Sequence, residues 1–260
     1  MNPVIFNRLK RYRVVVIALT LALGVSGCVW LRMLELKSQL SRFDENFKTS
    51  TSDSFALQFL HPVLYNDDYL TLARVKPTSE ENLAEGSRWK QLFHKLDANG
   101  QVAKGADIVF TLDFDKQEKL LRWEFSPSFM VMMPARFFEA SLRSLGKGKV
   151  DQDKNQMKVD PQDLPKLNEA PPKREQIIAL LGEPSEQSNQ NGLKLDIYRF
   201  RTDTSYVEPE YEDRRNASVK LYFEPKTNEL RKVTSRFLGL KFSIDFRNLI
   251  QLEALGTRKG

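Results

Sequence analysis

The sequence predicts an α+β protein with two small units of antiparallel sheet and packed helices, placed after an N-terminal signal or anchor segment. Three observations lead to this prediction. Apolar and polar residues alternate in several short runs, which is typical of strands with one buried face. Other apolar residues recur at intervals of three and four, which indicates helices. A polar, proline-rich stretch at 147–172 separates the two groups of elements.

The N-terminus has the layout of an export signal. Residues 1–13 carry four cations and no acid, and an uncharged apolar run follows over 14–25. A basic start, a short apolar core and small residues at its end are typical of a secretory signal peptide. The block Val25-Ser26-Gly27-Cys28 resembles the lipobox of bacterial lipoproteins. The resemblance implies a signal peptide over 1–27, a diacylglycerol on the Cys28 thiol, and acylation of the new N-terminus, with palmitate as an expected chain.

An uncleaved membrane anchor is the alternative for this segment. The chain carries no charge from Val14 to Leu31, and this length is just enough to span a bilayer. The preceding cations would keep the start of the chain in the cytoplasm. Both interpretations place the body in the periplasm. We prefer lipidation because Cys28, the single cysteine, stands where an export signal ends.

The residue after Cys28 bears on the destination of the protein. In enterobacterial lipoproteins, an aspartate after the acylated cysteine goes with retention in the inner membrane. The residue here is Val29. The resemblance therefore implies a lipid anchor in the outer membrane, facing the periplasm.

The charge balance gives no support to a nucleic-acid partner. The chain has 40 Lys and Arg against 34 Asp and Glu, a net charge of +6. Four of these cations lie in 1–27, which holds no acid, so the mature chain is expected to have 36 cations against 34 anions. A net charge of +2 does not demand a polyanionic partner. The hydrophobic content of 41% and the aromatic content of 10% fit a globular body.

The first unit is expected over 53–146, after a segment at 28–52 that contains an amphipathic helix. The expected elements, in chain order, are a helix over 30–46, a strand over 55–59, a hairpin of 108–114 with 121–125, and a helix over 134–145. Pro134 suits the first turn of that last helix, and Gly146 suits its C-terminal cap.

Residues 89–96 of the first unit fit two structures. Trp89, Leu92, Phe93 and Leu96 have helical spacing. Asn99-Gly100 is a favoured hairpin turn, however, and an aromatic strand leading into it is equally consistent with the pattern. The pattern leaves both open.

The second unit is expected over 173–250, after the linker at 147–172 and before a tail at 251–260. The expected elements, in chain order, are a helix over 173–181 closed by Gly182 and Pro184, strands over 193–201, 217–223, 229–236 and 241–246, and a turn at 225–228. The stretch 202–215 is expected to be a long charged loop.

The helix of the second unit ends in Leu-Leu-Gly-x-Pro, an aromatic pair marks the strand after it, and the next strand ends in phenylalanine. The residues that carry this pattern are Gln176, Ile177, Leu180, Leu181, Gly182, Pro184, Tyr198, Phe200, Val219, Leu221 and Phe223. The pattern resembles the BamE family of small outer-membrane lipoproteins, also called SmpA or OmlA, over about 60 residues. Two positions depart from the family: Pro171-Pro172 replaces the usual Gly-Met-Ser/Thr start, and Asp196 stands where tryptophan is expected. The resemblance implies a non-enzymatic assembly or binding lipoprotein, without fixing membership of the barrel-assembly complex.

A similar order of motifs occurs in the first unit. Val75-Lys76-Pro77, Trp89, Ile108–Phe114 and Leu120–Phe125 follow one another at intervals close to those of the second unit. A degenerate duplication explains this order, and so does chance similarity between two small hairpin domains. We favour chance similarity.

No motif for catalysis, a metal or a cofactor occurs in the sequence. The two histidines, His61 and His94, show no metal-ligand spacing, and the glycines form no phosphate-binding loop. Asp67 and Asp68 are the one candidate pair for acid/base work, although adjacent aspartates more often serve as turn and solvent residues. We expect no enzyme activity, no cofactor, no metal and no small-molecule substrate.

The preferred hypothesis is a non-catalytic binding or scaffolding lipoprotein with a protein partner in the envelope. Tyr206, Tyr211, Arg214 and Arg215 of the 202–215 loop are the candidate contact, because tyrosine and arginine are enriched at the energetic centres of interfaces. A mobile, solvated loop is the ordinary alternative.

Two further hypotheses stay open at this point. A periplasmic hydrolase would act on peptidoglycan or lipid through Asp67 or Asp68. A signal-anchored structural protein of the inner membrane would oligomerise through the helix at 30–46, although Asp44-Glu45-Asn46 interrupts its heptad pattern.

Overall fold

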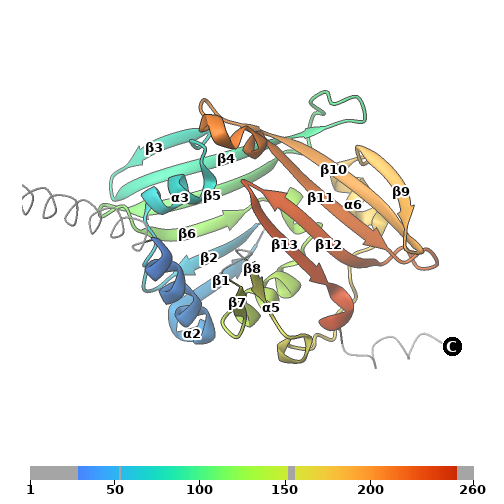
Figure 1. Cartoon of the computed structure of the whole chain (residues 1–260), viewed down its shortest axis with the longest axis horizontal. Helices are drawn as coiled ribbons and strands as arrows, with labels where there is room; N and C mark the ends of the chain where they lie inside the picture. Colours follow the sequence, from blue (N-terminus) through green and yellow to red (C-terminus); the bar gives the residue numbers. More distant parts are fainter. Residues whose placement is uncertain (1–28, 53, 152–155, 251–260) are drawn as a thin grey trace, which may run out of the picture.

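The computed structural model describes residues 29–52, 54–151 and 156–250. Its main feature is one antiparallel sheet of eleven strands that curls into a half-barrel (Figure 1). The strands lie in the order β1-β2-β6-β5-β4-β10-β11-β12-β13, with β3 beside β4 and β9 beside β10. The prediction of an α+β fold with two small units of antiparallel sheet is therefore wrong.

The elements of the sheet and of its covering layer have the following bounds. The strands are β1 (Phe47–Thr51), β2 (Phe55–Phe59), β3 (Ser79–Leu83), β4 (Gly86–Leu96), β5 (Ile108–Asp115), β6 (Leu120–Phe125), β9 (Glu186–Gln190), β10 (Leu193–Asp203), β11 (Asn216–Phe223), β12 (Leu230–Phe237) and β13 (Leu240–Asp245). The helices are α2 (Phe43–Asn46), α3 (Asn66–Ala73), α4 (Pro127–Met130), α5 (Ala135–Leu145) and α6 (Arg174–Leu181). Residues 29–41 form a further helix, here called the anchor-side helix. Within the expected linker, β7 (Lys149–Asp151) and β8 (Gln156–Lys158) form a separate hairpin.

The two expected units join where β4 and β10 pair. The first part of each strand pairs with a short partner, β3 or β9, and the last parts pair with each other, from Leu92 with Asp203 to Leu96 with Arg199. Alternation along a strand shows which residues face the core, but it does not show which strand lies beside which. This pairing makes one sheet out of two.

One aromatic core lies under both halves of the sheet. The ring of Phe237 in β12 lies 5.0 Å from that of Phe93 in β4 and 5.5 Å from that of Phe110 in β5. Phe129 of α4 contacts both Phe110 and Phe237. Such aromatic pairs contribute about 0.5–1.5 kcal/mol each beyond the burial of their surface. The two halves therefore share a core.

The covering helices all contact the inner face of the sheet. Tyr69 of α3 packs on Trp89, and Phe138 of α5 packs on Phe55. The alternation in β5 is complete: Ile108, Phe110, Leu112 and Phe114 are buried, and the residues between them are partly exposed. The outer side of β5 is consequently partly open to solvent, whereas Leu195 and Ile197 on the outer side of β10 are buried.

The two halves repeat the same arrangement, α3-β3-β4-β5-β6 and α6-β9-β10-β11-β12. The repeat extends to irregular features. The β5–β6 register shifts at Asp113/Phe114, and the β11–β12 register shifts at Tyr222/Phe223. The turns that follow hold Glu118 and Asn228 with φ of 64° and 55°.

Hydrogen bonds across the junction of the halves are reciprocal. The hydroxyl of Thr78, just before β3, donates to the carbonyl of Asp203 at the end of β10. The hydroxyl of Ser185, just before β9, donates to the carbonyl of Leu96 at the end of β4, at 2.6 Å. Chance similarity between hairpins would not reproduce the same bulge and the same cross-junction bonds, so the structure favours a duplication.

Most individual elements were predicted correctly. The hairpin of β5 with β6, helix α5, helix α6 and strands β10 to β13 all lie within a few residues of the expected ranges. Residues 89–96, which fitted a helix and a strand, belong to β4, and Gly100 after them has a φ of 76°.

Gly146 is the C-terminal cap of α5, as predicted, but it does not have the conformation that usually selects glycine there. Its φ of −57° is right-handed, so it is not a left-handed helix cap. A Cβ at this position would lie 2.3 Å from the backbone nitrogen of Ser41. Glycine is needed here because α5 ends against the backbone at the end of the anchor-side helix.

Candidate functional site

The predicted lipidation site lies just before the described residues. Cys28 and the lipobox residues Val25, Ser26 and Gly27 fall in 1–28, so lipidation stays a prediction. Within 29–52, 54–151 and 156–250, no helix combines the length and the hydropathy needed to cross a membrane. The anchor-side helix begins the described chain at Val29.

An ion pair fastens the anchor-side helix to the body. Arg32 donates from Nε to Oδ2 of Asp68 at 2.7 Å and from Nη2 to Oδ1 at 2.5 Å. Oδ2 of Asp68 also accepts the backbone N–H of Tyr65 at 2.9 Å, and the guanidinium lies 5.0 Å from the centre of the Tyr65 ring. The side chain of Asp68 is 2% exposed. Breaking a buried pair of this kind by removing one partner typically costs about 3–5 kcal/mol.

The acidic pair proposed for catalysis is therefore split between two environments. Asp68 has its carboxylate engaged by Arg32 and by the first turn of α3, whereas Asp67 is exposed. Two carboxylates that share acid/base work must both face the reacting group. The arrangement gives Asp68 a structural role.

The 202–215 stretch joins β10 to β11 and is hydrogen-bonded to the first half of the sheet. Contrary to the expectation from the sequence, it is not a loop throughout, because β10 extends to Asp203 and Pro209–Arg215 form a 3-10 helix. The backbone N–H of Lys76 donates to the carbonyl of Tyr206 at 3.1 Å. The backbone N–H of Glu208 donates to the carbonyl of Arg74 at 3.0 Å. These bonds tie the loop to the segment between α3 and β3, so the loop has a structural function that its sequence does not reveal.

Two of the four candidate contact residues in this loop are used internally. The ring of Tyr211 lies 5.2 Å from the guanidinium of Arg74 and 5.5 Å from that of Arg214. Arg214 also donates from Nη1 to the carbonyl of Leu238, at 2.6 Å. Tyr211 and Arg214 thus stabilise the loop and the turn that follows β12.

The other two candidates remain accessible. Tyr206 is 48% exposed. The side chain of Arg215 is 40% exposed and pairs with Glu212 at 2.7 Å. A partner that binds the loop would meet these two side chains directly.

His94 lies on the outer face of the β4–β10 junction, between two carboxylates. Its Nδ1 is 3.1 Å from Oδ2 of Asp107, and its Nε2 is 3.8 Å from Oδ2 of Asp203. Opposite it in the register stands Arg201. In the part of the chain that the structure describes, no group of three or more His, Cys, Asp or Glu residues is placed to hold a metal ion.

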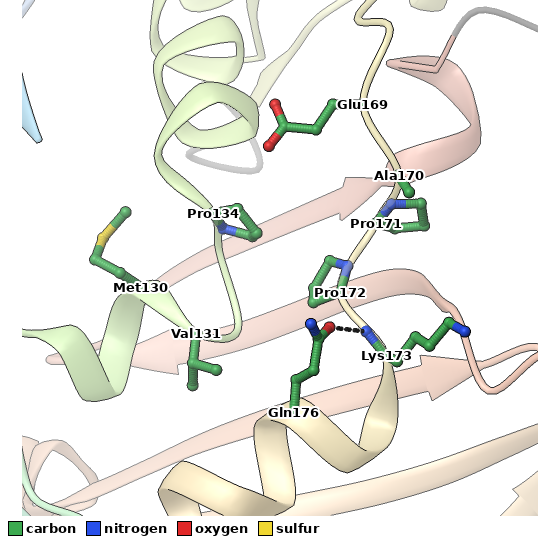
Figure 2. A pocket seen from close by; sticks show the side chains of 9 residues that line it. All are labelled: Met130, Val131, Pro134, Glu169, Ala170, Pro171, Pro172, Lys173 and Gln176. Carbon is green, nitrogen blue, oxygen red and sulfur yellow. Dashed lines mark hydrogen bonds between the residues drawn. The ribbon is translucent and has the colours of Figure 1, made fainter. Parts of the chain in front are cut away.

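A pocket of about 430 Å³ lies between the α4–α5 turn and the start of α6 (Figure 2). Its lining consists of Met130, Val131, Pro134, Glu169, Ala170, Pro171, Pro172, Lys173 and Gln176. Oε1 of Gln176 accepts the backbone N–H of Lys173 at 2.8 Å, and the Glu169 carboxylate lies 3.7 Å from Arg136. Gln176 is therefore hydrogen-bonded, whereas Oε2 of Glu169 is buried without a hydrogen-bond partner among the described residues, and most of the other lining residues are apolar.

Strand β13 forms one end of the sheet (Figure 1). Among the described residues it pairs with β12 alone, from Leu240 with Phe237 to Asp245 with Lys232. Leu240 is 55% exposed. The long edge of β13 is therefore open, and the sequence pattern, which predicts the strand, does not show that it lies at an edge.

The outer face beside this edge is rich in cations. In the register, Arg236 of β12 lies opposite Lys241 of β13, and Lys220 of β11 lies two residues along on the same face. Lys232 lies opposite Asp245 and 5.8 Å from the ring of Tyr222. This surface, here called the β11–β13 face, carries four cations on neighbouring strands, of which Arg236 is paired with Asp213 and Lys232 lies opposite Asp245.

Comparison with known proteins found no matching family model, no similar curated protein and no similar solved structure. The resemblance of the second half to the BamE family therefore depends only on the sequence pattern described above. Gly182 ends α6 with a φ of 69°, and Tyr198 and Phe200 are buried in β10. The short strand β9 stands between these two elements.

Proposed function

We propose that this protein is a lipid-anchored lipoprotein of the bacterial envelope that binds a protein partner through the edge of β13 and catalyses no reaction. The leader and Cys28 support the anchor, and Val29 supports the outer membrane. The resemblance to the BamE family supports a binding or assembly role, including a role in the assembly of outer-membrane proteins.

The observation that carries the binding role is the open edge of β13. An edge strand presents unpaired N–H and C=O groups, and an extended segment of another protein can add to it as a further strand. A two-residue turn, Leu238-Gly239, closes on the pair of Phe237 and Leu240. The closing pair of such a turn is hydrogen-bonded, and hydrogen-bonded and non-hydrogen-bonded pairs then alternate along the two strands. Ser243 falls in a non-hydrogen-bonded pair, so its N–H faces the open edge.

The charge beside this edge indicates the chemistry of the partner segment. A strand added to β13 would place every second side chain on the outer face, next to Lys241, Ser243 and Asp245. Opposite charges on neighbouring strands are favourable. We therefore expect an extended segment with an acidic residue beside Lys241 and no acidic residue beside Asp245.

Site-specific photo-crosslinking in intact cells tests the contact. A photoreactive amino acid at Leu240 should give a discrete adduct, whereas the same group at Lys90, exposed on the outer face of β4, should not. Ser243→Pro removes an outward N–H at an edge position that tolerates proline, so it should abolish the adduct while the circular dichroism is retained. If Tyr206 crosslinks and Leu240 does not, the partner binds the 202–215 loop and the β13 proposal is wrong.

The anchor is tested separately by mass spectrometry of the mature N-terminus. A lipidated peptide that begins at Cys28 is expected, and Cys28→Ala should accumulate as unprocessed precursor. An intact peptide joining Gly27 to Cys28 in the mature protein would instead support the uncleaved anchor.

A further inference from the structure

The start of the anchor-side helix exposes large apolar side chains. Trp30 is 37% exposed, Leu31 is 66% exposed and Leu34 is 41% exposed. Their spacing of three and four residues places them on one face of the helix. We call these three residues the apolar patch. Beyond it, the exposed positions of the helix are Glu35, Ser38 and Ser41.

The other side of this helix is attached to the body. Gln39 and Leu40 are buried, and Nε2 of Gln39 donates to the carbonyl of His61 at 2.8 Å. Leu36 packs against the core. The exposed face therefore changes along the axis, from apolar beside Cys28 to polar one turn later.

The extent of the apolar patch matches the depth of a membrane interface. Leu34 lies six residues after Cys28, which corresponds to about 9 Å along a helix that rises 1.5 Å per residue. Helices that lie at a bilayer surface bury their apolar side chains about 5–10 Å into it. Tryptophan is enriched at that level because its ring is amphipathic.

The ion pair described above fixes the patch relative to the body. Arg32 stands next to Leu31 and is held by the buried carboxylate of Asp68. The ring of Tyr65, which Arg32 contacts, is also contacted by Lys119 of the β5–β6 turn, whose Nζ lies 5.7 Å from the ring centre. A membrane that contacts the apolar patch therefore also lies close to the end of the sheet at the β5–β6 turn.

We infer that the apolar patch is inserted in the lipid–water interface of the membrane and that the body is held there in one orientation, with the β5–β6 turn toward the headgroups. This inference rests on the proposed lipid anchor at Cys28. It adds that the anchor is not a flexible tether: the first turns after the lipid are themselves a membrane contact.

Single introduced cysteines test the inference in the full mature lipoprotein. The lipidated thiol of Cys28 cannot react, so Leu31→Cys, Leu34→Cys or Ser38→Cys supplies the one free thiol. Each variant is reconstituted in vesicles of phosphatidylethanolamine and phosphatidylglycerol and treated with a bulky, membrane-impermeant maleimide. Leu31→Cys and Leu34→Cys should remain unlabelled while Ser38→Cys is labelled to completion, and all three should react after denaturation in SDS.

The outcomes separate this inference from the anchor proposal. If the mass of the N-terminal peptide shows lipid on Cys28 but Leu31→Cys and Leu34→Cys react as fast as Ser38→Cys, the interface contact is refuted and the anchor stands. If Cys28 carries no lipid and is itself labelled in a protein that does not sediment with membranes, both are refuted.

Discussion

Replacing Lys95 by methionine tests how the two halves of the sheet are held together. Lys95 lies on the inner face of β4 and is 4% exposed. Its ammonium group donates to the carbonyl oxygens of Leu181 and Glu183, the latter at 2.6 Å, and lies 5.4 Å from the ring of Tyr198. One residue of the first half thus satisfies the C-terminal end of α6 in the second half.

The size of the effect follows from opposing contributions. A hydrogen bond to a charged group contributes about 1.5–3 kcal/mol, and Lys95→Met removes two of them. Burial lowers the pKa of Lys95, because removal from water disfavours the charged ammonium group. This desolvation cost offsets part of the free energy gained from the two hydrogen bonds. Methionine keeps most of the apolar length, so little cavity is left. We expect a net loss of about 2–3 kcal/mol in the free energy of unfolding.

Urea and thermal unfolding of the purified protein, followed by tryptophan fluorescence and far-UV circular dichroism, measure this loss. A change of 2–3 kcal/mol lowers the melting temperature of a body of this size by roughly 4–12 °C. The matched control is Lys90→Met, an exposed lysine on the same strand, which should change stability by less than about 0.5 kcal/mol. Equal stability of Lys95→Met and Lys90→Met would refute the reasoning that Lys95 joins the halves.

Two further predictions concern positions that the fold constrains. Gly86→Ala should lower the free energy of unfolding by at least ~3 kcal/mol, because the φ of Gly86 is 149° and a Cβ would lie 1.9 Å from the carbonyl oxygen of Phe114. Gly100→Ala is the matched control: Gly100 has a φ of 76° and open space around it, so the loss in the same melts should be only about 1 kcal/mol. Arg214→Ala should cost about 2 kcal/mol, since its guanidinium bonds a turn carbonyl and stacks on a ring. Arg215→Ala, which loses a surface pair, should stay within about 0.5 kcal/mol, and similar losses for both variants would contradict the structural role of the loop.

Sequence reasoning found the elements of this protein more reliably than their arrangement. Helix α6 was recognised from its apolar spacing and from Gly182, whose φ of 69° confirms the expected stop. Strand β5 was recognised from an alternation that the structure reproduces residue by residue. Both signals are local, since each depends on residues within about one turn or one pleat of each other.

The functional candidates show the limit of local patterns. Asp68 looked like half of an acidic pair until the structure placed Arg32 against it, 36 residues earlier in the chain. Arg214 looked like an interface residue until its guanidinium was found on the carbonyl of Leu238. In both cases the neighbouring sequence does not reveal this partner of the charged side chain, and folding brings the partner to it from a distant part of the chain.

By itself the sequence determined the order of many helices and strands and the buried face of the strands that it predicted, because these follow from periodicity along the chain; the export leader with Cys28 stays a prediction. Only the tertiary structure decided that β4 and β10 pair, that the two halves share one core, and that β13 is left at an open edge. Which strands lie side by side depends on contacts between residues far apart in the chain, and no periodicity within a segment encodes its neighbour.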